Sequence, residues 1–327
     1  MKKLLGVAIV LLLVVSTYLL GPKKEIPQLD PTLKSSATLA SWMEEEKQMD
    51  VIPGCESLVW YANDSSRSKT KYVLLYLHGF SASPVEGDPI HLYVARKYGM
   101  NLFAPLLADH GLNSEEPLLD FTAEKWLESC KKAIQIAAAL GDSIVLMSTS
   151  TGGTSALFLS NSHPQIHSLI CYSPNTELAR KESDLLLGPW GLQLGRLVNG
   201  GKYYNWEVPR EARKYWYNRY RLEAVLELKA LLKSTMTIET FSSVRKPLFV
   251  GYYDKNENER DDQVSIERME MMFDNASTLD DKKWFVNFYN AGAHCVPSKY
   301  FSKDTLAVQQ MTDRFIQEVL NIQSRLE

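Results

Sequence analysis

Short runs of apolar, β-branched and aromatic residues recur along this chain between segments in which apolar residues return every three or four positions. Several of the short runs are apolar almost throughout, which is typical of parallel strands that helices cover on both faces. We predict strands over residues 58–62, 72–77, 102–106, 144–147, 168–172, 247–253 and 284–289. The alternation of strands with helices indicates an α/β fold with a mostly parallel central sheet flanked by helices.

The longer periodic segments predict amphipathic helices. Over residues 122–140, Trp126, Leu127 and Ile134 recur at helical spacing, so we expect one side of that helix to face the sheet. A similar pattern over residues 304–326 predicts a C-terminal helix.

One long stretch between two predicted strands interrupts the alternation. It covers residues 176–244 and includes Trp190, Trp206, Trp216 and several tyrosines. Structureless connections beyond about 15 residues are uncommon in compact domains. We therefore predict a helical cap inserted over residues 176–244, with most of its aromatic residues in the core of the cap and a few beside an apolar substrate pocket.

The N-terminus has the features of a targeting segment. Lys2 and Lys3 precede a mostly apolar run over residues 4–20. This run is slightly longer than a usual signal-peptide core and at the short limit for a bilayer-spanning helix, and it lacks a clear small-residue cleavage site. We expect residues 1–21 to be an export signal or membrane anchor. We favour the uncleaved anchor. It would be a transmembrane helix, with the folded part of the chain outside the cytoplasm.

The segment after this run is rich in proline, lysine and polar residues, so we predict a linker over residues 22–35. Residues 36–327 then form the folded domain, in which the cap is an insertion. The length of 327 residues allows one large domain of this kind.

Composition and charge narrow the classes of function. With a net charge of −3 and no stripe of basic residues, the chain lacks the electrostatic signature of nucleic-acid binding, and we expect no nucleic-acid partner. The four cysteines form no CxxC pair, so neither a zinc finger nor a dense disulfide framework is indicated. His163 and His167 lie four residues apart but have no third ligand, so we expect no metal site.

A candidate nucleophile follows the predicted strand 144–147. The strand leads into Ser148-Thr149-Ser150-Thr151-Gly152-Gly153 and then into a helix-compatible segment. A serine on a sharp strand-to-helix turn requires small residues two positions before and after it, because the backbone packs closely there. Ser148 and Gly152 occupy those positions, although the first is usually glycine. We predict Ser150 as the nucleophile.

Two further loops supply candidates for the oxyanion hole and the base. The strand 72–77 ends in His78-Gly79-Phe80, and the backbone N–H groups of Phe80 and Thr151 can together hold an oxyanion. His78 itself is expected to be structural. His294 follows the last strand in a glycine-containing turn at the carboxyl end of the sheet, where open α/β sheets bind ligands. We predict His294 as the general base.

The acid that orients the base should follow the strand 247–253. Asp254 lies at the end of that strand, whereas Asp261 precedes a helical segment that begins near Ile266. We prefer Asp261, with Asp254 as the alternative.

With Leu77-His78-Gly79-Phe80, Ser150 in its turn, Asp261 and Ala293-His294 in this order, the chain resembles the α/β-hydrolase superfamily. It is most similar to carboxylesterases and monoacylglycerol-lipase-like serine hydrolases. The resemblance covers roughly residue 71 to the C-terminus and implies an eight-stranded, mostly parallel sheet, no cofactor, and a small-molecule ester or lipid as substrate.

The reaction implied by the resemblance is ester hydrolysis through an acyl-enzyme, with a Ser-His-Asp triad. Two alternatives stay open at this point. An amidase or peptidase uses the same triad, and a non-catalytic protein of the cell envelope can keep the fold for binding alone.

Overall fold

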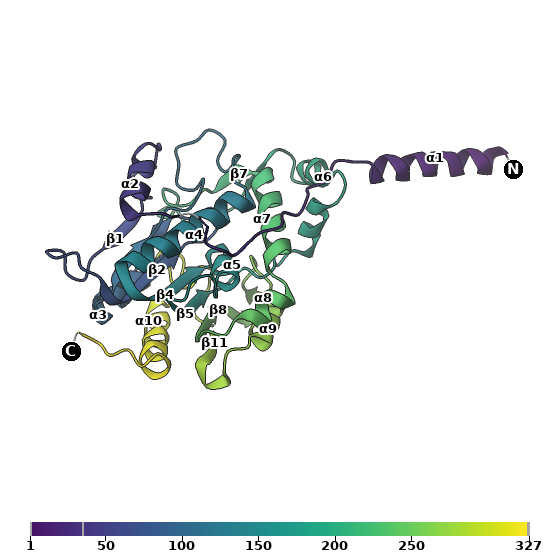
Figure 1. The fold of residues 1–327 in the computed structure, drawn as a ribbon. Helices are drawn as coiled ribbons and strands as arrows, with labels where there is room; N and C mark the ends of the chain where they lie inside the picture. The colour runs from purple at the N-terminus through teal and green to yellow at the C-terminus, as the bar shows by residue number, and fades with distance from the viewer. Residues whose placement is uncertain (1, 35, 326–327) are drawn as a thin grey trace.

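The computed structural model describes residues 2–34 and 36–325, and its centre is a seven-stranded sheet in the order β1-β3-β2-β4-β5-β8-β11 (Figure 1). Neighbouring strands are parallel except β1, which pairs antiparallel with β3 at one edge. The strands are β1 (Leu58–Trp60), β2 (Thr70–Leu77), β3 (Asn101–Ala104), β4 (Gly141–Thr149), β5 (Ile166–Tyr172), β8 (Leu248–Tyr252) and β11 (Lys283–Asn287). These are the seven strands that the apolar runs predict, and the α/β fold is confirmed.

The sheet has one strand fewer than the resemblance implies. Seven strands of the described residues form it, so the expectation of eight is wrong for this part of the chain. The segment directly before β1 contains Pro53 and Gly54, two residues that are depleted in strands. Val51 makes only an isolated bridge to Leu112.

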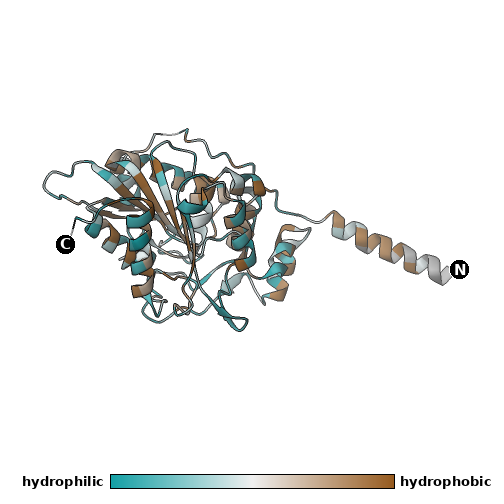
Figure 2. Ribbon diagram, turned by 90° about the horizontal axis from the view of Figure 1, so that it is seen from below, coloured by the Kyte–Doolittle hydropathy of each residue, from teal (hydrophilic) through white to brown (hydrophobic). Residues whose placement is uncertain are grey.

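Helices cover both faces of the sheet and enclose two cores. Along β2, side chains alternate between them: Val73, Leu75 and Leu77 belong to one core, and Leu74 and Tyr76 to the other. This alternation is the period of two that a strand imposes. Figure 2 shows the strands with many apolar residues, and helices around them that carry both polar and apolar residues.

The first core is covered by α4 (Ala123–Leu140), α5 (Thr151–Phe158) and α9 (Ile266–Asn275). Thr122 caps α4 by accepting a hydrogen bond from the Lys125 N–H, which satisfies one of the free donors at the helix start. Trp126 and Ile134 of α4 are completely buried, as the helical spacing predicts.

The second core is covered by α3 (Ile90–Tyr98) and α10 (Thr305–Arg314). The predicted C-terminal helix over residues 304–326 is shorter than expected. A π-helical turn over Phe315–Val319 follows α10, and Asn321 has a φ of 54°, a left-handed conformation that ends a helix. Leu326 lies outside the described residues.

The long segment between β5 and β8 forms six elements. These are the 3₁₀ helix η2 (Lys181–Leu187), α6 (Gly191–Val198), the strands β6 (Tyr203–Asn205) and β7 (Arg219–Arg221), α7 (Leu222–Thr235) and α8 (Ile238–Ser243). The strands β6 and β7 form an antiparallel hairpin. Leu228, Leu231 and Phe241 of α7 and α8 are part of the first core, so these two helices pack on the main domain.

The N-terminal helix α1 (Lys2–Leu19) projects from the body beside α6 (Figure 1). The indole N–H of Trp190 donates to the Thr17 carbonyl at 3.0 Å. Within the described residues, no helix combines the length and the apolar character that a bilayer crossing requires. The transmembrane anchor expected over residues 1–21 therefore finds no support in the described part of the chain.

Residues 22–34 have no helix or strand but lie against the body of the protein. The Lys24 ammonium is 2.5 Å from the Glu227 carboxylate, and the Pro27 carbonyl accepts from the Ser234 hydroxyl at 2.6 Å. Leu29 and Leu33 pack against the first core. Ser35, at the predicted end of the linker, lies outside the described residues, as do Met1 and residues 326–327. The helix α2 (Leu39–Lys47) follows.

Candidate active site

Ser150 lies in the turn between β4 and α5. Its φ of 52° and ψ of −118° fall in a region that costs a residue with a Cβ roughly 1–3 kcal/mol. The Ser150 N–H donates to the Tyr172 carbonyl at 2.9 Å. The Ser150 carbonyl accepts from the N–H groups of Gly153 at 2.8 Å and Asn175 at 2.9 Å. Several backbone contacts thus hold a strained serine, only 9% exposed, at the carboxyl end of the sheet.

Small residues around Ser150 allow the backbone to pack this closely. A Cβ on Gly152 would lie 2.1 Å from the Leu77 carbonyl oxygen, so only glycine fits there. A Cβ on Gly79 would lie 3.0 Å from the Ser150 Cβ, which places the loop after β2 directly against the serine. Ser148 replaces the usual glycine, and its buried hydroxyl faces the Cys171 sulfur at 3.5 Å.

His294 and Asp261 meet across 33 residues of sequence. Nδ1 of His294 lies 2.6 Å from Oδ2 of Asp261. The other oxygen, Oδ1, accepts from the backbone N–H groups of Gln263 at 2.9 Å and Val264 at 3.3 Å. Asp261 is 4% exposed, so its carboxylate is fixed by hydrogen bonds and orients the imidazole.

Asp254 is placed elsewhere. It begins a short hairpin of β9 (Asp254–Asn256) and β10 (Glu259–Arg260), and its carboxylate lies 3.6 Å from the Arg260 guanidinium. Its backbone N–H donates to the Asn287 side chain at 3.0 Å. The structure therefore brings Asp261, and not the alternative Asp254, to His294.

The surroundings of His294 favour its charged form. Burial alone lowers the pKa of His294, but the charge of Asp261 and the hydrogen bond to it outweigh burial and raise the pKa above 6.5. The charge of Glu86 acts in the same direction. The loop is held in place because the Ser173 hydroxyl donates to the His294 carbonyl at 2.8 Å.

The two backbone N–H groups predicted for an oxyanion hole flank the serine. Thr151 is the first residue of α5, where the helix N-terminus favours negative charge. Phe80 follows Gly79, the residue that lies against Ser150. Among the described residues, neither the Phe80 N–H nor the Thr151 N–H donates a hydrogen bond to the protein, so both remain available to an oxyanion.

His78 serves the structure, as expected. It is buried, its Nδ1 donates to the Gly79 carbonyl at 2.8 Å, and its Nε2 accepts from the Leu107 N–H at 3.0 Å. Burial, together with the charge of His110, holds the pKa of His78 well below its usual value. A neutral histidine with both nitrogens engaged in this way is not a free base.

Glu86 is a buried residue of this region that the sequence reasoning did not single out. It lies in the 3₁₀ helix η1 (Pro84–Gly87), is 1% exposed, and accepts from the Gly79 N–H at 2.6 Å. The thiol of Cys295, next to His294, lies 3.6 Å from the other Glu86 oxygen. No local sequence pattern marks a glutamate of this kind, because its partners are distant in the chain.

The cysteines of the described residues are all free and buried. Burial raises the pKa of the Cys295 thiol well above its usual value, and the charge of Glu86 adds to the effect. A thiol in this state is a poor nucleophile. Within the described part of the chain, no group of three or more His, Cys, Asp or Glu side chains is arranged to hold a metal ion.

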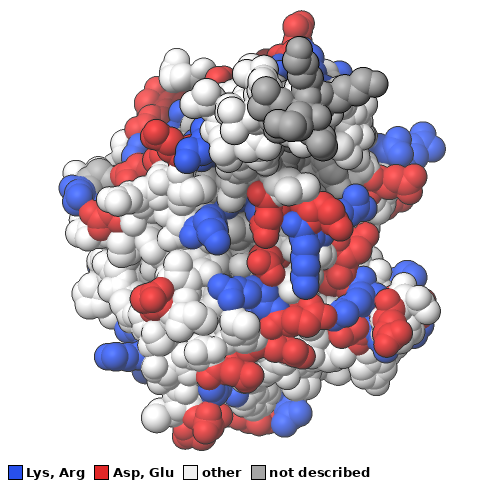
Figure 3. All heavy atoms as spheres, turned by 90° about the vertical axis from the view of Figure 1, so that its right-hand side faces the viewer, with Lys and Arg blue, Asp and Glu red and all other residues white. Residues whose placement is uncertain are grey.

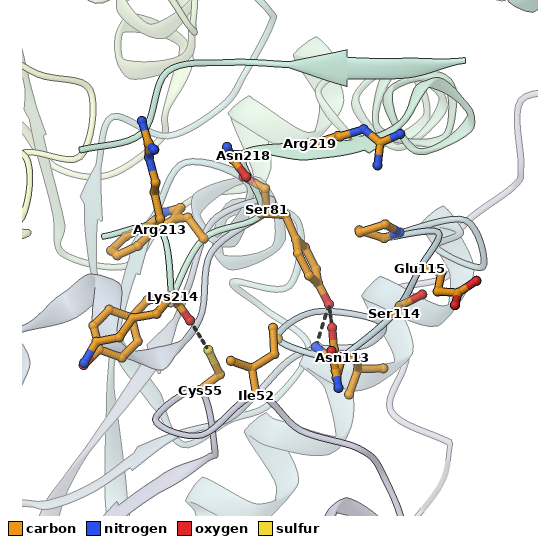
Figure 4. Close-up of a pocket in the computed structure, with 16 residues that line it drawn as sticks. Ile52, Cys55, Ser81, Asn113, Ser114, Glu115, Arg213, Lys214, Asn218 and Arg219 are labelled. Carbon is orange, nitrogen blue, oxygen red and sulfur yellow. Dashed lines mark hydrogen bonds between the residues drawn. The ribbon is translucent and has the colours of Figure 1, made fainter. Parts of the chain in front are cut away.

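We call the loop after β2, residues 78–81, the oxyanion loop. A cavity of about 360 Å³ lies beside it (Figure 4). Ser81 lines the cavity together with Ile52, Cys55, Pro117 and residues 111–115 and 213–219. Its lining is mixed and largely polar, in contrast to the apolar pocket that the aromatic residues of the cap predict. Figure 4 shows Arg213 and Arg219 directed away from each other on either side of Ser81. The triad candidates are not among the residues that line this cavity.

Aromatic residues of the cap connect the oxyanion loop to the loop that carries His294. Trp216 is 3% exposed and packs edge-on against Phe301 at 5.0 Å, and Trp206 stacks on the same ring at 6.1 Å. The backbone N–H of Tyr217 donates to the Ser81 carbonyl at 2.8 Å. Residues 206–217 thus form a strap that contacts both loops, and we call them the cap strap.

Charges are mixed on the side of the molecule from which α1 projects. Figure 3 shows acidic and basic side chains interspersed there, without a patch of one sign. Ion pairs near the cap follow this pattern: Arg221 pairs with both Glu116 and Glu223, and Lys202 lies 2.8 Å from Glu116.

No protein-family model matches the chain, and no curated protein matches it in sequence. Solved structures are similar in fold. A structure reported for LipS and LipT, two metagenome-derived lipolytic enzymes, is 16% identical with a TM-score of 0.65, over 82% of this chain and 99% of that one.

Two further structures have the same architecture. Est1E from Butyrivibrio proteoclasticus is 15% identical with a TM-score of 0.53, over 81% of this chain and 94% of that one. The monoacylglycerol lipase of Paleococcus ferrophilus is 9% identical with a TM-score of 0.54, over 80% of this chain and 97% of that one. Together with the sheet order and the strained serine turn, these likenesses show that the chain has the α/β-hydrolase fold.

Proposed function

We propose that the protein is a serine hydrolase that cleaves carboxylic esters through an acyl-enzyme. The observation that carries the proposal is that one chain holds both a strained Ser150, at the N-cap of α5, and a His294–Asp261 hydrogen bond of 2.6 Å. Strain of this kind persists only where surrounding contacts enforce it, and it gathers at functional sites. Serine, histidine and aspartate are the residue types of the Ser-His-Asp template, and we propose the roles of that template for them.

In the proposed reaction, His294 takes the proton of the Ser150 hydroxyl while the oxygen attacks the ester carbonyl. The N–H groups of Phe80 and Thr151 stabilise the oxyanion, because neither donates to an acceptor in the described part of the chain. The imidazolium then gives its proton to the leaving alcohol, and water releases the acyl group by the same steps. Asp261 keeps the imidazole in the required tautomer and stabilises its charge.

The substrate class proposed is a small carboxylic ester or lipid. Two of the fold neighbours are described as lipolytic enzymes and as a monoacylglycerol lipase, which supports an ester over an amide. An amidase or peptidase on the same triad is the second candidate. A comparison of nitrophenyl esters with matched anilides separates the two, because an amidase hydrolyses both.

The test of the nucleophile is Ser150→Ala. We expect the variant to lose turnover of short nitrophenyl esters by at least about 10⁴-fold, since removal of a triad nucleophile leaves only binding and oxyanion stabilisation. Labelling by a fluorophosphonate probe should disappear as well. Ser148→Ala is the matched control, because it removes a neighbouring hydroxyl and should stay labelled.

Labelling that persists in Ser150→Ala would show that another residue is the nucleophile. If the unchanged protein neither turns over esters nor takes up the probe, it is a non-catalytic member of the fold.

We further propose that the catalytic domain lies outside the cytoplasm. Two lysines followed by a mostly apolar run support an export signal. N-terminal sequencing of the protein recovered from cell fractions tests this proposal. Recovery from the cytoplasm alone, with residues 1–21 intact, would contradict it.

A further inference from the structure

One buried carboxylate contacts the loops on which the proposed reaction depends. Glu86 is 1% exposed and accepts from the Gly79 N–H at 2.6 Å and from the Tyr76 hydroxyl at 3.1 Å through Oε2. Its Oε1 faces the Cys295 thiol at 3.6 Å. A buried charge of this sort is costly unless it is well hydrogen-bonded, and all three partners can donate.

Each of these contacts leads to a different part of the candidate site. Gly79 precedes Phe80, and a Cβ on Gly79 would lie 3.0 Å from both the Ser150 Cβ and Oε1 of Glu86. The Tyr76 hydroxyl also bonds the Thr149 hydroxyl at 2.9 Å, one residue before Ser150. Cys295 follows His294. Glu86 is therefore tied to the oxyanion loop, to the serine turn and to the base loop.

The pattern of donors fits the ionised carboxylate. Tyr76 donates to Glu86 if it accepts from Thr149, and the Gly79 N–H can only donate. Burial raises the pKa of Glu86 to about 6, with the Gly79 hydrogen bond and the charge of His294 acting in the opposite direction. At neutral pH the group is mostly negative and raises the pKa of His294.

We propose that Glu86 is a positioning residue for acyl transfer. It fixes the His78–Gly79 peptide by accepting from the Gly79 N–H, so that the loop presents the next N–H, that of Phe80, to the oxyanion, and its charge stabilises the protonated His294 that forms when Ser150 attacks. This inference rests on the proposed function. It assigns Glu86 no contact with the substrate and no proton transfer of its own.

Two substitutions separate the hydrogen bond from the charge. Glu86→Gln keeps an oxygen that can accept from Gly79 but removes the charge, whereas Glu86→Asp keeps the charge on a shorter side chain. We expect Glu86→Gln to lower kcat for a nitrophenyl ester about 10- to 100-fold with little change in KM, because oxyanion stabilisation and geometry act on the transition state. Glu46→Gln is the matched control, since Glu46 is also buried, at 8% exposed, but contacts Ser57 instead.

The pKa of His294 distinguishes the proposed role from a purely structural one. If Glu86 only supported the fold, removal of its charge would leave this pKa unchanged. The ionisable groups that face Glu86 are Tyr76 from β2 and His294 and Cys295 from the loop after β11. Burial raises the pKa of Tyr76 and of Cys295 well above their usual values, so both stay neutral. Asp261 and Asp262 also act on His294 and are unchanged in the variants. Removing the Glu86 charge should lower the pKa of His294 by about one unit.

The experiment follows the His294 imidazole by NMR titration in the unchanged protein and in the variants, alongside kcat and KM. Glu86→Gln should lower the pKa of His294, and Glu86→Asp and Glu46→Gln should leave it near the value of the unchanged protein. If the unchanged protein hydrolyses no ester, the proposed function fails while the titration still decides the role of the charge.

A folded Glu86→Gln variant with unchanged kcat and an unchanged His294 pKa would overturn the inference. If Glu86→Gln does not fold, Tyr76→Phe takes its place, because it removes one donor to Glu86 and keeps the buried ring. It should lower kcat about fivefold, the equivalent of one hydrogen bond, and an unchanged kcat in that variant would also contradict the role.

Discussion

Ser150 combines two properties that oppose each other at the scale of one residue. Its φ of 52° suits glycine far better than serine, yet the proposed reaction needs its hydroxyl. Neighbouring residues remove the alternatives, because Gly152 has no space for a Cβ and backbone hydrogen bonds hold Ser150 on both sides. We therefore expect the strain at Ser150 to lower the free energy of unfolding of the protein. This loss of stability accompanies the hydroxyl that the reaction needs.

The substitution Ser150→Gly tests this trade-off. Glycine relieves the strain of a positive φ but makes the unfolded chain more flexible, so we expect the free energy of unfolding to rise by about 1 kcal/mol, while ester turnover is lost. Urea denaturation measures the change. Ser150→Ala is the control, since it removes the hydroxyl without relieving the backbone. Equal stability of the two variants would show that the turn stores no strain.

The His294–Asp261 pair makes a prediction about pH. The base must be neutral to accept a proton, and its pKa is raised above 6.5, mainly by Asp261 against the effect of burial. The apparent pKa of His294 in the pH–rate profile should therefore lie above 6.5. We expect kcat/KM to fall as the pH drops below this pKa. Asp261→Asn should lower kcat on the order of 10²- to 10⁴-fold and move the acid limb to lower pH.

Asp254→Asn is the matched control for the acid, and its pH–rate profile should stay close to that of the unchanged protein. A greater loss of kcat in Asp254→Asn than in Asp261→Asn would reverse the assignment.

The stability of the protein depends on pH in the opposite direction to its activity. A raised folded pKa of His294 contributes stability that is complete below about pH 6.5 and is lost as the pH rises through the folded pKa.

The residues of the site differ in how far the sequence predicts them. Ser150 is marked by its own turn, because small residues must surround a serine between a strand and a helix. Asp261 and Asp254 both follow β8, and only the fold of the β9–β10 hairpin decides which of them reaches His294. Glu86 carries no local signal, since its partners Gly79 and Cys295 are defined only in three dimensions.

At the scale of elements, apolar runs predict strands well and predict packing partners poorly. All seven strands coincide with such runs. The inner strands are buried on both faces and therefore need apolar residues throughout, whereas the edge strands β1 and β11 are only partly buried. The pattern of α7 marks an amphipathic helix but not the surface that it covers. Leu228 and Leu231 pack in the core of the main domain, a contact that sequence periodicity does not specify.

The cap strap should control access to the candidate site. Phe301 contacts both Trp206 and Trp216, so it holds residues 206–217 on the loop that follows His294. We expect Phe301→Ala to speed amide hydrogen exchange across the strap and to cost on the order of 1–3 kcal/mol of stability, from lost ring contacts and burial. KM for bulky esters should change more than KM for acetate esters.

Phe273→Ala is the matched control for this prediction. Phe273 is partly buried and packs on Phe285 at 5.0 Å, away from the strap. That variant should lose stability without faster exchange over residues 206–217. An equal change in both variants would mean that the strap only reports on global stability.

At the scale of the whole molecule, the segment before the folded domain has a structural role that its composition conceals. A sequence rich in proline and lysine predicts a tether, yet residues 22–34 bind along the body through Lys24, Pro27, Leu29 and Leu33. Composition indicates how flexible a segment is in isolation. It does not indicate whether the folded domain has a surface to which the segment can bind. Here α7, which follows about two hundred residues later, provides the partners of Lys24 and Pro27, and Lys131 of α4 donates to the Asp30 carbonyl.

Two truncated proteins test the role of this segment. A protein that starts at residue 22 keeps every contact of the docked segment, and we expect it to match the unchanged domain in ester turnover and thermal midpoint. A protein that starts at residue 36 loses the Leu29 and Leu33 contacts and the Lys24–Glu227 ion pair. It should be less stable by about 2–4 kcal/mol, mainly because apolar surface is returned to water.

The double substitution Leu29→Ala with Leu33→Ala, in the protein that starts at residue 22, is the control. It should reproduce most of that loss of stability without deleting any part of the chain. If the two truncated proteins unfold at the same urea concentration, residues 22–34 act as a tether after all, and their contacts with α7 contribute no stability.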